Sequence, residues 1–223
     1  MYERTEGLIG RNGVEKLKNA HIFVIGLGGV GSYAAEACAR SGVGRLTLVD
    51  FDTVSPSNLN RQLYALNSTL GIKKAYAAEQ RIRDINPDCV TEAESIFITS
   101  ENTKSLHLEN ADFVIDAVDN VSAKLAVAKF CKGKNIRHIS VMGTANKTDP
   151  TRLTVTDIYK TKNCPLAKVM RKLCRENGIA DMRVVYSDQL PTVRTVPVSS
   201  MIFVPASAGL LAAREAVFDI LNM

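Results

Sequence analysis

An apolar run that ends in closely spaced glycines constrains the fold of this chain more than any other feature. The run Ile22-Phe-Val-Ile-Gly-Leu-Gly-Gly-Val-Gly31 predicts a buried strand, a sharp turn at Gly26 and a helix over residues 30–41. Gly28 removes the side chain that would block a phosphate, and Gly31 allows close contact between helix and strand. The first amides of such a helix point at an anion, so the run predicts a phosphate site.

The next predicted strand ends in a carboxylate, Asp50, about 20 residues after the last glycine. At that spacing a carboxylate can accept hydrogen bonds from ribose hydroxyls. Glycines after a strand sometimes form only a tight turn. Here a strand, the glycines, a helix, a second strand and an acid follow one another at the expected spacing, which favours a nucleotide site.

Apolar runs alternate with segments of helical period through residue 143. Strands are predicted at 21–26, 45–50, 90–97, 112–116 and 136–141, and helices at 12–18, 30–41, 71–85 and 120–133. This alternation predicts an α/β fold, with a Rossmann-like, doubly wound, mostly parallel sheet that has helices on both faces.

After Gly143 the pattern changes. Antiparallel strands are predicted at 152–158 and 183–186, a basic helix at 165–176, a loop at 188–200 and a final helix at 207–221. We therefore expect one domain over residues 1–223. It would comprise a nucleotide-binding core, residues 1–143, and a C-terminal extension of the sheet, residues 144–223.

Composition limits the class of protein. Hydrophobic residues make up 46% of the 223 residues, enough to bury the core of one large domain. The N-terminus is acidic and no apolar run follows it, so we expect a cytoplasmic protein with no membrane segment. The five cysteines include no Cys-x-x-Cys pair, which argues against a disulfide framework or a zinc ribbon. A reactive role for Cys164 or Cys174 stays open, because both lie in a basic segment.

Three further segments carry polar residues in a specific pattern. They are Asp52-Thr-Val-Ser-Pro-Ser-Asn-Leu-Asn-Arg-Gln62, Leu70-Gly-Ile-Lys-Lys74 and Val114-Ile-Asp-Ala-Val-Asp-Asn120. Together with the glycine-rich turn, these segments resemble the ubiquitin-activating, ThiF-type adenylating superfamily. Its members share Ser-Asn-Leu-x-Arg-Gln, a lysine at the start of the next helix, and Asp-x-x-Asp-Asn.

The resemblance implies that a carboxylate attacks the α-phosphorus of ATP while pyrophosphate leaves. Arg61 and Lys74 would neutralise the developing charge, Asn58 would donate to a phosphate, and Asp119 would bind Mg²⁺. The expected catalytic residues are Arg61, Lys74 and Asp119. The expected nucleotide-binding residues are Gly26, Gly28, Gly29, Gly31, Asp50, Asp52, Asn58, Arg61, Lys74 and Asp119.

Structural alternatives exist for each of these charged residues. Arg61 could pair with Asp52 on an exposed surface, where an ion pair contributes little, and Lys74 could be a solvated helix residue. Asp116 and Asp119 could cap the following helix. We favour a structural role for Asp116. For the other three we favour function, because all follow the carboxyl ends of strands, where doubly wound sheets bind ligands.

Other segments narrow the resemblance. The longest, Met142-Gly-Thr-Ala-Asn-Lys-Thr-Asp-Pro-Thr-Arg152, is similar to the tRNA threonylcarbamoyladenosine dehydratases, and the similarity spans nearly the whole chain. It implies ATP-dependent cyclisation of a modified adenosine in tRNA. The threonyl carboxylate is adenylated and then attacked from within the same side chain, which expels AMP. The resemblance also implies a homodimer, and it leaves room for a sulfur-transfer protein as a partner.

A basic segment independently fits an RNA partner. Residues 145–175 contain eight Lys and Arg residues against two Asp, while the whole chain has a net charge of +5. Such a segment can supply the salt-dependent attraction that tRNA binding needs. The alternative is a solvated basic helix that aids solubility.

Three positions depart from the pattern of such relatives. Gly7 stands where an arginine that reaches a neighbouring subunit is usual, which puts that contribution in question. Ile72-Lys73 replaces a residue–proline pair before Lys74, so we expect a looser helix start. Ser199-Ser200-Met201 stands where a glycine is common, so we expect a different local turn.

Three other functions compete with this interpretation. The first is adenylation of the C-terminal diglycine of a ubiquitin-like sulfur carrier, which uses the same ATP residues. The missing Cys-x-x-Cys motifs and the basic segment argue against it. A nicotinamide-dependent dehydrogenase would share the glycines and Asp50 but has no use for Arg61, Lys74 and Asp119. A catalytically silent binding module would not need all of these charged residues.

Overall fold

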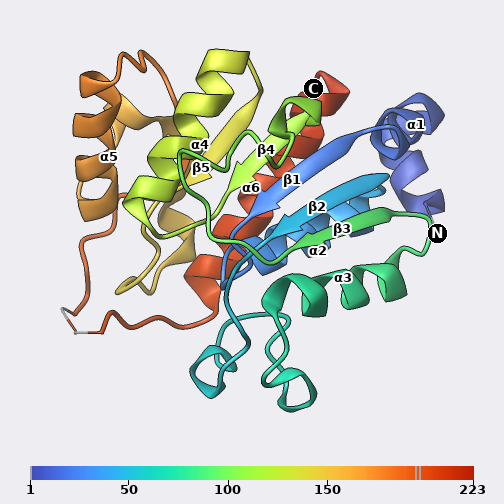
Figure 1. Ribbon diagram of the computed structural model, residues 1–223, viewed down its shortest axis with the longest axis horizontal. Coiled ribbons are helices and arrows are strands. Elements are labelled where there is room, and N and C mark those ends of the chain that lie inside the picture. The colour runs from blue at the N-terminus through green and yellow to red at the C-terminus, as the bar shows by residue number, and fades with distance from the viewer. Residues whose placement is uncertain (1, 194, 196) are drawn as a thin grey trace.

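Within the described residues, seven strands form a single sheet in the order β3-β2-β1-β4-β5-β7-β6, and only β6 and β7 are antiparallel to one another (Figure 1). The structure is a computed structural model that describes residues 2–193, 195 and 197–223. The strands are β1 His21–Ile25, β2 Arg45–Val49, β3 Val90–Glu94, β4 Phe113–Asp116, β5 His138–Val141, β6 Leu153–Asp157 and β7 Arg183–Ser187. The predicted fold class, including the antiparallel C-terminal strands, is confirmed.

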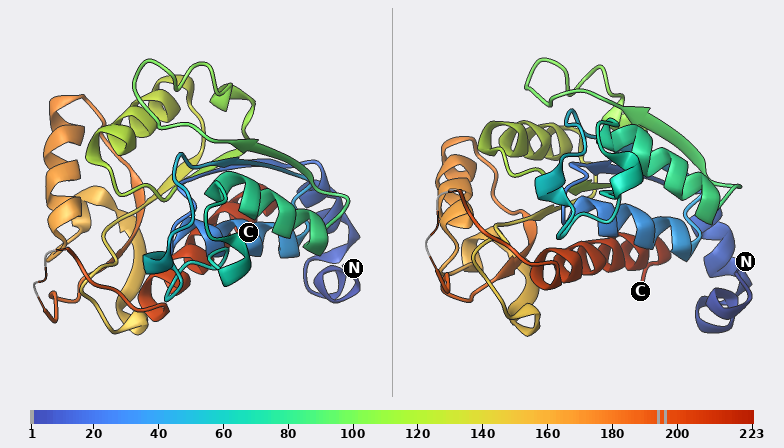
Figure 2. Two further views of the ribbon diagram at one scale, coloured as in Figure 1. Left: turned by 60° about the horizontal axis from the view of Figure 1, so that its bottom comes forward. Right: turned by 90° about the horizontal axis from the view of Figure 1, so that it is seen from below.

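Helices cover both faces of the sheet. They are α1 Glu3–Lys18, α2 Gly31–Ser41, α3 Lys74–Ile85, α4 Val121–Lys134, α5 Pro165–Glu176 and α6 Phe203–Leu221. Single turns of 3-10 helix lie at Pro56–Asn58, Asn67–Thr69, Leu108–Asn110, Pro150–Arg152 and Ile158–Lys160. Helices α2 and α6 run side by side along one face, and α4 lies on the other (Figure 2). None of the described helices is long and apolar enough to cross a membrane.

The central strand β1 is buried along its whole length, as expected for a parallel strand covered on both faces. Its alternate side chains enter different cores. Ile22 and Val24 pack under α2 and α6, while Phe23 and Ile25 pack toward α4. From β1 the chain proceeds outward through β2 to β3, and it then returns to β4 on the other side. Such a reversal of strand order opens a crevice at the carboxyl edge of the sheet.

Several elements begin or end elsewhere than predicted. Helix α1 begins at Glu3 rather than residue 12, and it is interrupted at Gly10, where φ is 72°. Strand β3 ends at Glu94 rather than residue 97. The predicted loop 188–200 includes Arg194 and Val196, which lie outside the described residues. Its described residues contain no helix or strand.

Helix α6 begins at Phe203, one turn earlier than predicted. Pro205 is compatible with this start, because the first turn of a helix leaves its N–H groups unpaired in any case. A Cβ atom added to Gly209 would lie 2.2 Å from the carbonyl oxygen of Val30. Glycine at this position therefore lets α6 pack directly against the start of α2.

Candidate nucleotide-binding site

A cavity of about 360 Å³ lies at the carboxyl edge of the sheet, above the ends of β3, β2, β1, β4 and β5. The structure brings nine of the ten predicted nucleotide-binding residues to its wall. They are Gly26, Gly28, Gly29, Asp50, Asp52, Asn58, Arg61, Lys74 and Asp119. Its lining residues extend from Ile25 to Pro205, so the cavity is built from segments that lie up to 180 residues apart in the sequence.

The glycines of the turn have distinct structural roles. Gly26 has a φ of 87°, and an added Cβ would lie 2.8 Å from the backbone of Ala117 after β4. Gly31 is the predicted residue that does not line the cavity. An added Cβ there would lie 1.7 Å from the Gly26 carbonyl oxygen, so Gly31 serves the close packing of helix on turn. Around Gly28, by contrast, an added Cβ would meet only the Gln62 side chain, at 3.7 Å.

The Asp50 carboxylate holds the glycine-rich turn through hydrogen bonds to backbone N–H groups. Its Oδ2 accepts a hydrogen bond from the backbone N–H of Leu27 at 2.7 Å, and its Oδ1 accepts one from Asp52 at 2.8 Å. Burial raises the pKa of the Asp50 carboxyl above its usual value, and the Lys74 ammonium and these backbone donors partly offset the rise. The carboxylate therefore shapes the wall of the cavity before any ligand arrives.

The chain between β2 and α3 leaves the sheet and returns to it. Thr53 and Lys73 form an antiparallel bridge at its base, and the backbone N–H of Lys74 donates to the Asp52 carbonyl at 3.0 Å. The Lys73 ammonium donates to the Phe51 carbonyl at 2.9 Å. These contacts hold the start of α3 in place, although no proline precedes it.

Lys74 is not a solvated helix residue. Its side chain is only 7% exposed, and Nζ lies 2.8 Å from Oδ2 of Asp52, whose side chain is 47% exposed. Asp52 therefore pairs with Lys74 and not with Arg61, contrary to the structural alternative considered for Arg61. The pair places an ammonium at the wall of the cavity.

Arg61 forms no ion pair with any other described residue. Its Nη1 donates to the Ser57 carbonyl at 2.8 Å and to Oδ1 of Asn60 at 2.9 Å. The neighbouring Asn58 is buried, and its Oδ1 accepts a hydrogen bond from the Ser55 backbone at 3.1 Å. This loop thus presents an uncompensated guanidinium to the cavity.

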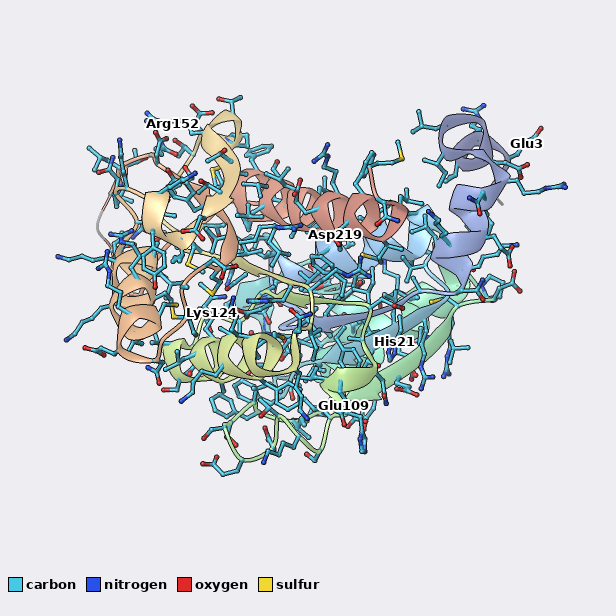
Figure 3. All side chains as sticks on the ribbon, turned by 90° about the horizontal axis from the view of Figure 1, so that it is seen from above. Glu3, His21, Glu109, Lys124, Arg152 and Asp219 are labelled. Atoms are coloured by element: carbon cyan, nitrogen blue, oxygen red, sulfur yellow. The ribbon has the colours of Figure 1, made fainter. Side chains whose placement is uncertain are left out.

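The two aspartates after β4 differ sharply. Asp116 is buried, and its Oδ2 accepts hydrogen bonds from Lys124 at 3.0 Å and from Ser140 at 2.6 Å, so its contacts are structural. Lys124 extends from α4 toward the sheet (Figure 3).

Asn120 caps α4, because its Oδ1 accepts a hydrogen bond from the backbone N–H of Ala123 at 3.0 Å. Asp119 is exposed, and its carboxylate makes no hydrogen bond or ion pair with another described residue.

Sequence reasoning missed the apolar wall of the cavity. Phe51 and Phe97 also line it and meet edge to face, with ring centroids 4.9 Å apart. Both rings are exposed, at 47% and 41%. Phe51 lies between Asp50 and Asp52, and this position could have indicated that its ring lies at the site. Phe97 gave no such signal, because it was assigned to a predicted strand. Met142 and Leu166 line the opposite end, beyond β5.

The cysteines offer no second site. All five are free and buried, including Cys164 and Cys174, whose reactivity the sequence left open. Burial raises the pKa of the Cys174 thiol, which opposes thiolate formation. The described residues contain no group of three or more His, Cys, Asp or Glu side chains that could hold a metal.

The fold and the cavity define a nucleotide-binding protein of the doubly wound class. The model of the ThiF family matches residues 2–222, and the chain belongs to this family. It is 44% identical over 240 aligned positions to the tRNA threonylcarbamoyladenosine dehydratase of Bacillus subtilis, with 99% of this chain and 94% of that protein covered. It is 33% identical to the molybdopterin-synthase adenylyltransferase of Haemophilus influenzae, with 76% and 67% covered.

A solved structure agrees closely with this one. The tRNA N6-threonylcarbamoyladenosine dehydratase of Escherichia coli, TcdA, crystallised in complex with ATP, matches it with a TM-score of 0.95 at 33% identity. The match covers 99% of this chain and 93% of that one. Because it spans both the glycine-rich core and the C-terminal extension, the likeness extends over the whole fold.

We predict that Asp50→Asn both destabilises the protein and weakens ATP binding. An amide has one acceptor, so one of the two backbone N–H groups loses its partner and faces an N–H₂ group, at a cost of about 1–3 kcal/mol. Urea unfolding and calorimetric titration with ATP measure the two effects. The exposed Asp84→Asn is the matched control, and equal stability of the two variants would contradict the role given to Asp50.

Proposed function

We propose that the protein is an ATP-dependent tRNA threonylcarbamoyladenosine dehydratase. The observation that carries the proposal is the convergence of Arg61, Lys74 and Asp119 on the cavity of the glycine-rich turn. A 44% identical relative that this chain covers almost completely has that name, which supports the substrate. The proposed site would use ATP to activate the threonyl carboxylate of the modified adenosine.

The chemistry has two balanced steps. A carboxylate oxygen attacks the α-phosphorus of ATP, the bond to the bridging oxygen breaks, and pyrophosphate leaves, giving an acyl adenylate. A nucleophilic atom of the same side chain then attacks the acyl carbon, loses its proton and expels AMP, which closes a ring. The net change is loss of water from the substrate and hydrolysis of ATP to AMP and pyrophosphate.

The charged residues suit the first step, which brings two anions together. The guanidinium of Arg61 and the ammonium of Lys74 would lower the repulsion and stabilise charge on the phosphates. Positively charged groups of this kind are worth about 10³–10⁵ in the rate of phosphoryl transfer. The partial positive charge at the N-terminus of α2 acts in the same direction.

The residues present also fit Mg²⁺. In proteins this ion is typically held by one or two carboxylates together with substrate phosphates, so it does not need a cluster of protein ligands. Asp119 offers a carboxylate on the cavity wall that makes no hydrogen bond or ion pair within the described chain. A magnesium ion held there would neutralise charge on the leaving pyrophosphate.

Two rival functions fit less well. Adenylation of a sulfur-carrier protein would use the same cations, and the 33% identical molybdopterin-synthase adenylyltransferase shows that such proteins are related. That relative has a lower sequence identity to this chain than the dehydratase of Bacillus subtilis has, and a smaller share of its own length is matched. A nicotinamide-dependent dehydrogenase has no need of a guanidinium that lacks an acidic partner at the phosphates.

The substrate is tested by AMP release. We expect the purified protein, with ATP and Mg²⁺, to release AMP when tRNA carrying threonylcarbamoyladenosine is added, and not when the same tRNA lacks the modification. Mass spectrometry of the digested tRNA should show an adenosine lighter by one water molecule. Stimulation by a protein ending in diglycine, without a response to modified tRNA, would instead support the rival adenylation.

We predict that Asp119→Ala abolishes turnover and leaves the fold intact. The carboxylate is exposed and fills no core volume, so its removal should change the free energy of unfolding by less than about 0.5 kcal/mol. AMP release and urea unfolding measure the two quantities. Asp88→Ala, at another exposed aspartate, is the control. Normal turnover in the Asp119 variant would contradict the metal-binding role.

The structure reduces the predicted basic segment to a smaller surface. Lys147 is buried and donates to the Ser187 carbonyl, Arg152 pairs with Asp188, and Arg171 donates to Thr161. Within residues 145–175, the exposed cations without an acidic partner among the described residues are Lys160, Lys162, Lys168 and Arg175. We call these four residues the α5 surface. Lys168 and Arg175 lie on α5, whose first turn also carries Leu166 at the cavity wall, so tRNA phosphates bound along α5 would sit near the site.

We predict that Lys162→Gln with Lys168→Gln weakens tRNA binding in a salt-dependent way. Removal of each lysine–phosphate interaction should lower the slope of log K against log salt by about 0.7–0.9. Filter binding between 50 mM and 200 mM salt is a suitable measurement. The control is Lys104→Gln with Lys134→Gln, at exposed lysines on other segments, and its slope should match the parent. An unchanged slope in the first variant would favour the solubility role.

The predicted homodimer and sulfur-transfer partner stay predictions. The first half of α1 carries Leu8, whose side chain is 79% exposed, and Gly7 has no atom within 4 Å of an added Cβ. Nε of Arg11 lies 3.7 Å from Oε1 of Glu6 in the same chain, and both side chains are exposed. This segment is therefore available to contact a second copy of the chain.

A further inference from the structure

Asn60 links the cation loop to the C-terminal half of the chain. Its Oδ1 accepts a hydrogen bond from Nη1 of Arg61 at 2.9 Å, and its Nδ2 donates to the carbonyl of Ser200 at 2.9 Å. Arg61 and Ser200 both line the cavity, from opposite halves of the sequence. Asn60 occupies the variable position of Ser-Asn-Leu-x-Arg-Gln, and the proposed chemistry gives it no role.

The two contacts fix the orientation of the amide. A flip of Asn60 would place its N–H₂ group against Arg61 and its oxygen against the Ser200 carbonyl, so both hydrogen bonds would break. With Asn60 in place, Nη1 of Arg61 is held by two acceptors, the second being the Ser57 carbonyl. The other guanidinium nitrogens make no hydrogen bond with a described residue, which leaves their donors for a phosphate.

Ser200 belongs to the connector, which we define as residues 188–193, 195 and 197–202 between β7 and α6. Its described side chains bury little apolar surface, since Val198 is 68% exposed and Met201 is 58% exposed. Polar contacts attach it instead. Asn146, after β5, exchanges two hydrogen bonds with the backbone of Ser199, at 2.7 Å and 2.9 Å. A segment attached in this way has low local stability, so a single further contact can affect its position.

We propose that Asn60 is a positioning residue that couples the connector to the guanidinium of Arg61. When the connector is seated, Asn60 holds Arg61 in the orientation that receives the phosphates. When ATP engages Arg61, the same amide holds the connector over the cavity. The inference rests on the proposed use of ATP, and it is independent of which carboxylate is activated.

The coupling is tested by ATP affinity in a double-mutant cycle. Asn60→Ala should weaken ATP binding about tenfold, the size of a missing hydrogen bond to a charged group. In an Arg61→Ala background the same change should alter ATP binding by less than about twofold, because Asn60 then has no guanidinium to hold. Calorimetric titration without tRNA gives all four affinities. An equal loss in both backgrounds would overturn the proposal.

Hydrogen exchange of the backbone amides of residues 198–201 supplies a readout that a purely structural role would not change. ATP should slow exchange there in the parent protein and should no longer do so in Asn60→Ala. Asn60→Asp retains an acceptor for Arg61 but loses the donor to Ser200, so it should also lose the ATP-dependent protection. Retained protection in both variants would overturn the coupling.

Controls separate this inference from the proposed function. Asn12→Ala removes an exposed asparagine on α1 and should bind ATP as the parent does. If the parent itself fails to bind ATP, the proposed function fails. If the parent binds ATP and Asn60→Ala matches it in affinity and connector protection, only the role of Asn60 fails.

Discussion

The hydrogen bond between the Asp50 carboxylate and the Leu27 backbone is the contact on which the site depends. It joins the end of β2 to the glycine-rich turn of β1, and the second oxygen of the same carboxylate orders the chain that leads to Asp52. Asp52 in turn fixes Lys74. One buried acid thus sets the positions of the amides of the glycine-rich turn and, through Asp52, of a cation.

Because the cavity crosses the ends of several strands, the chemical character of its lining changes from the β3 end to the β5 end. The aromatic pair of Phe51 and Phe97 lies toward β3. The glycine-rich turn follows above β1, and Asp119 follows above β4. Beyond β5 come small and apolar side chains and the first turn of α5. This end of the cavity is therefore the one nearest α5, the helix that carries Lys168 and Arg175.

The sequence predicted the parts of this arrangement that depend on local pattern. Arg61, Lys74 and Asp119 were predicted from the resemblance of their motifs to the ThiF-type superfamily, and each lies at the cavity after the end of a strand. The pairing of Lys74 with Asp52 could not be predicted, because it depends on a bridge that closes a loop of about 20 residues, and no local signal encodes that closure. The basic segment was overestimated for a related reason. Charge counting cannot reveal that Lys147 is buried against the Ser187 carbonyl.

The contact of Gly209 with the start of α2 has a consequence for synthesis of the chain. This glycine lets α6 approach the start of α2 closely, and the same helix brings Pro205 beside Gly29 at the cavity wall. A cavity wall that begins with the glycine-rich turn is therefore completed by a helix about 175 residues later in the sequence. A nascent chain that already contains the glycine-rich turn, Lys74 and Asp119 lacks this part of the cavity wall until α6 has emerged and docked.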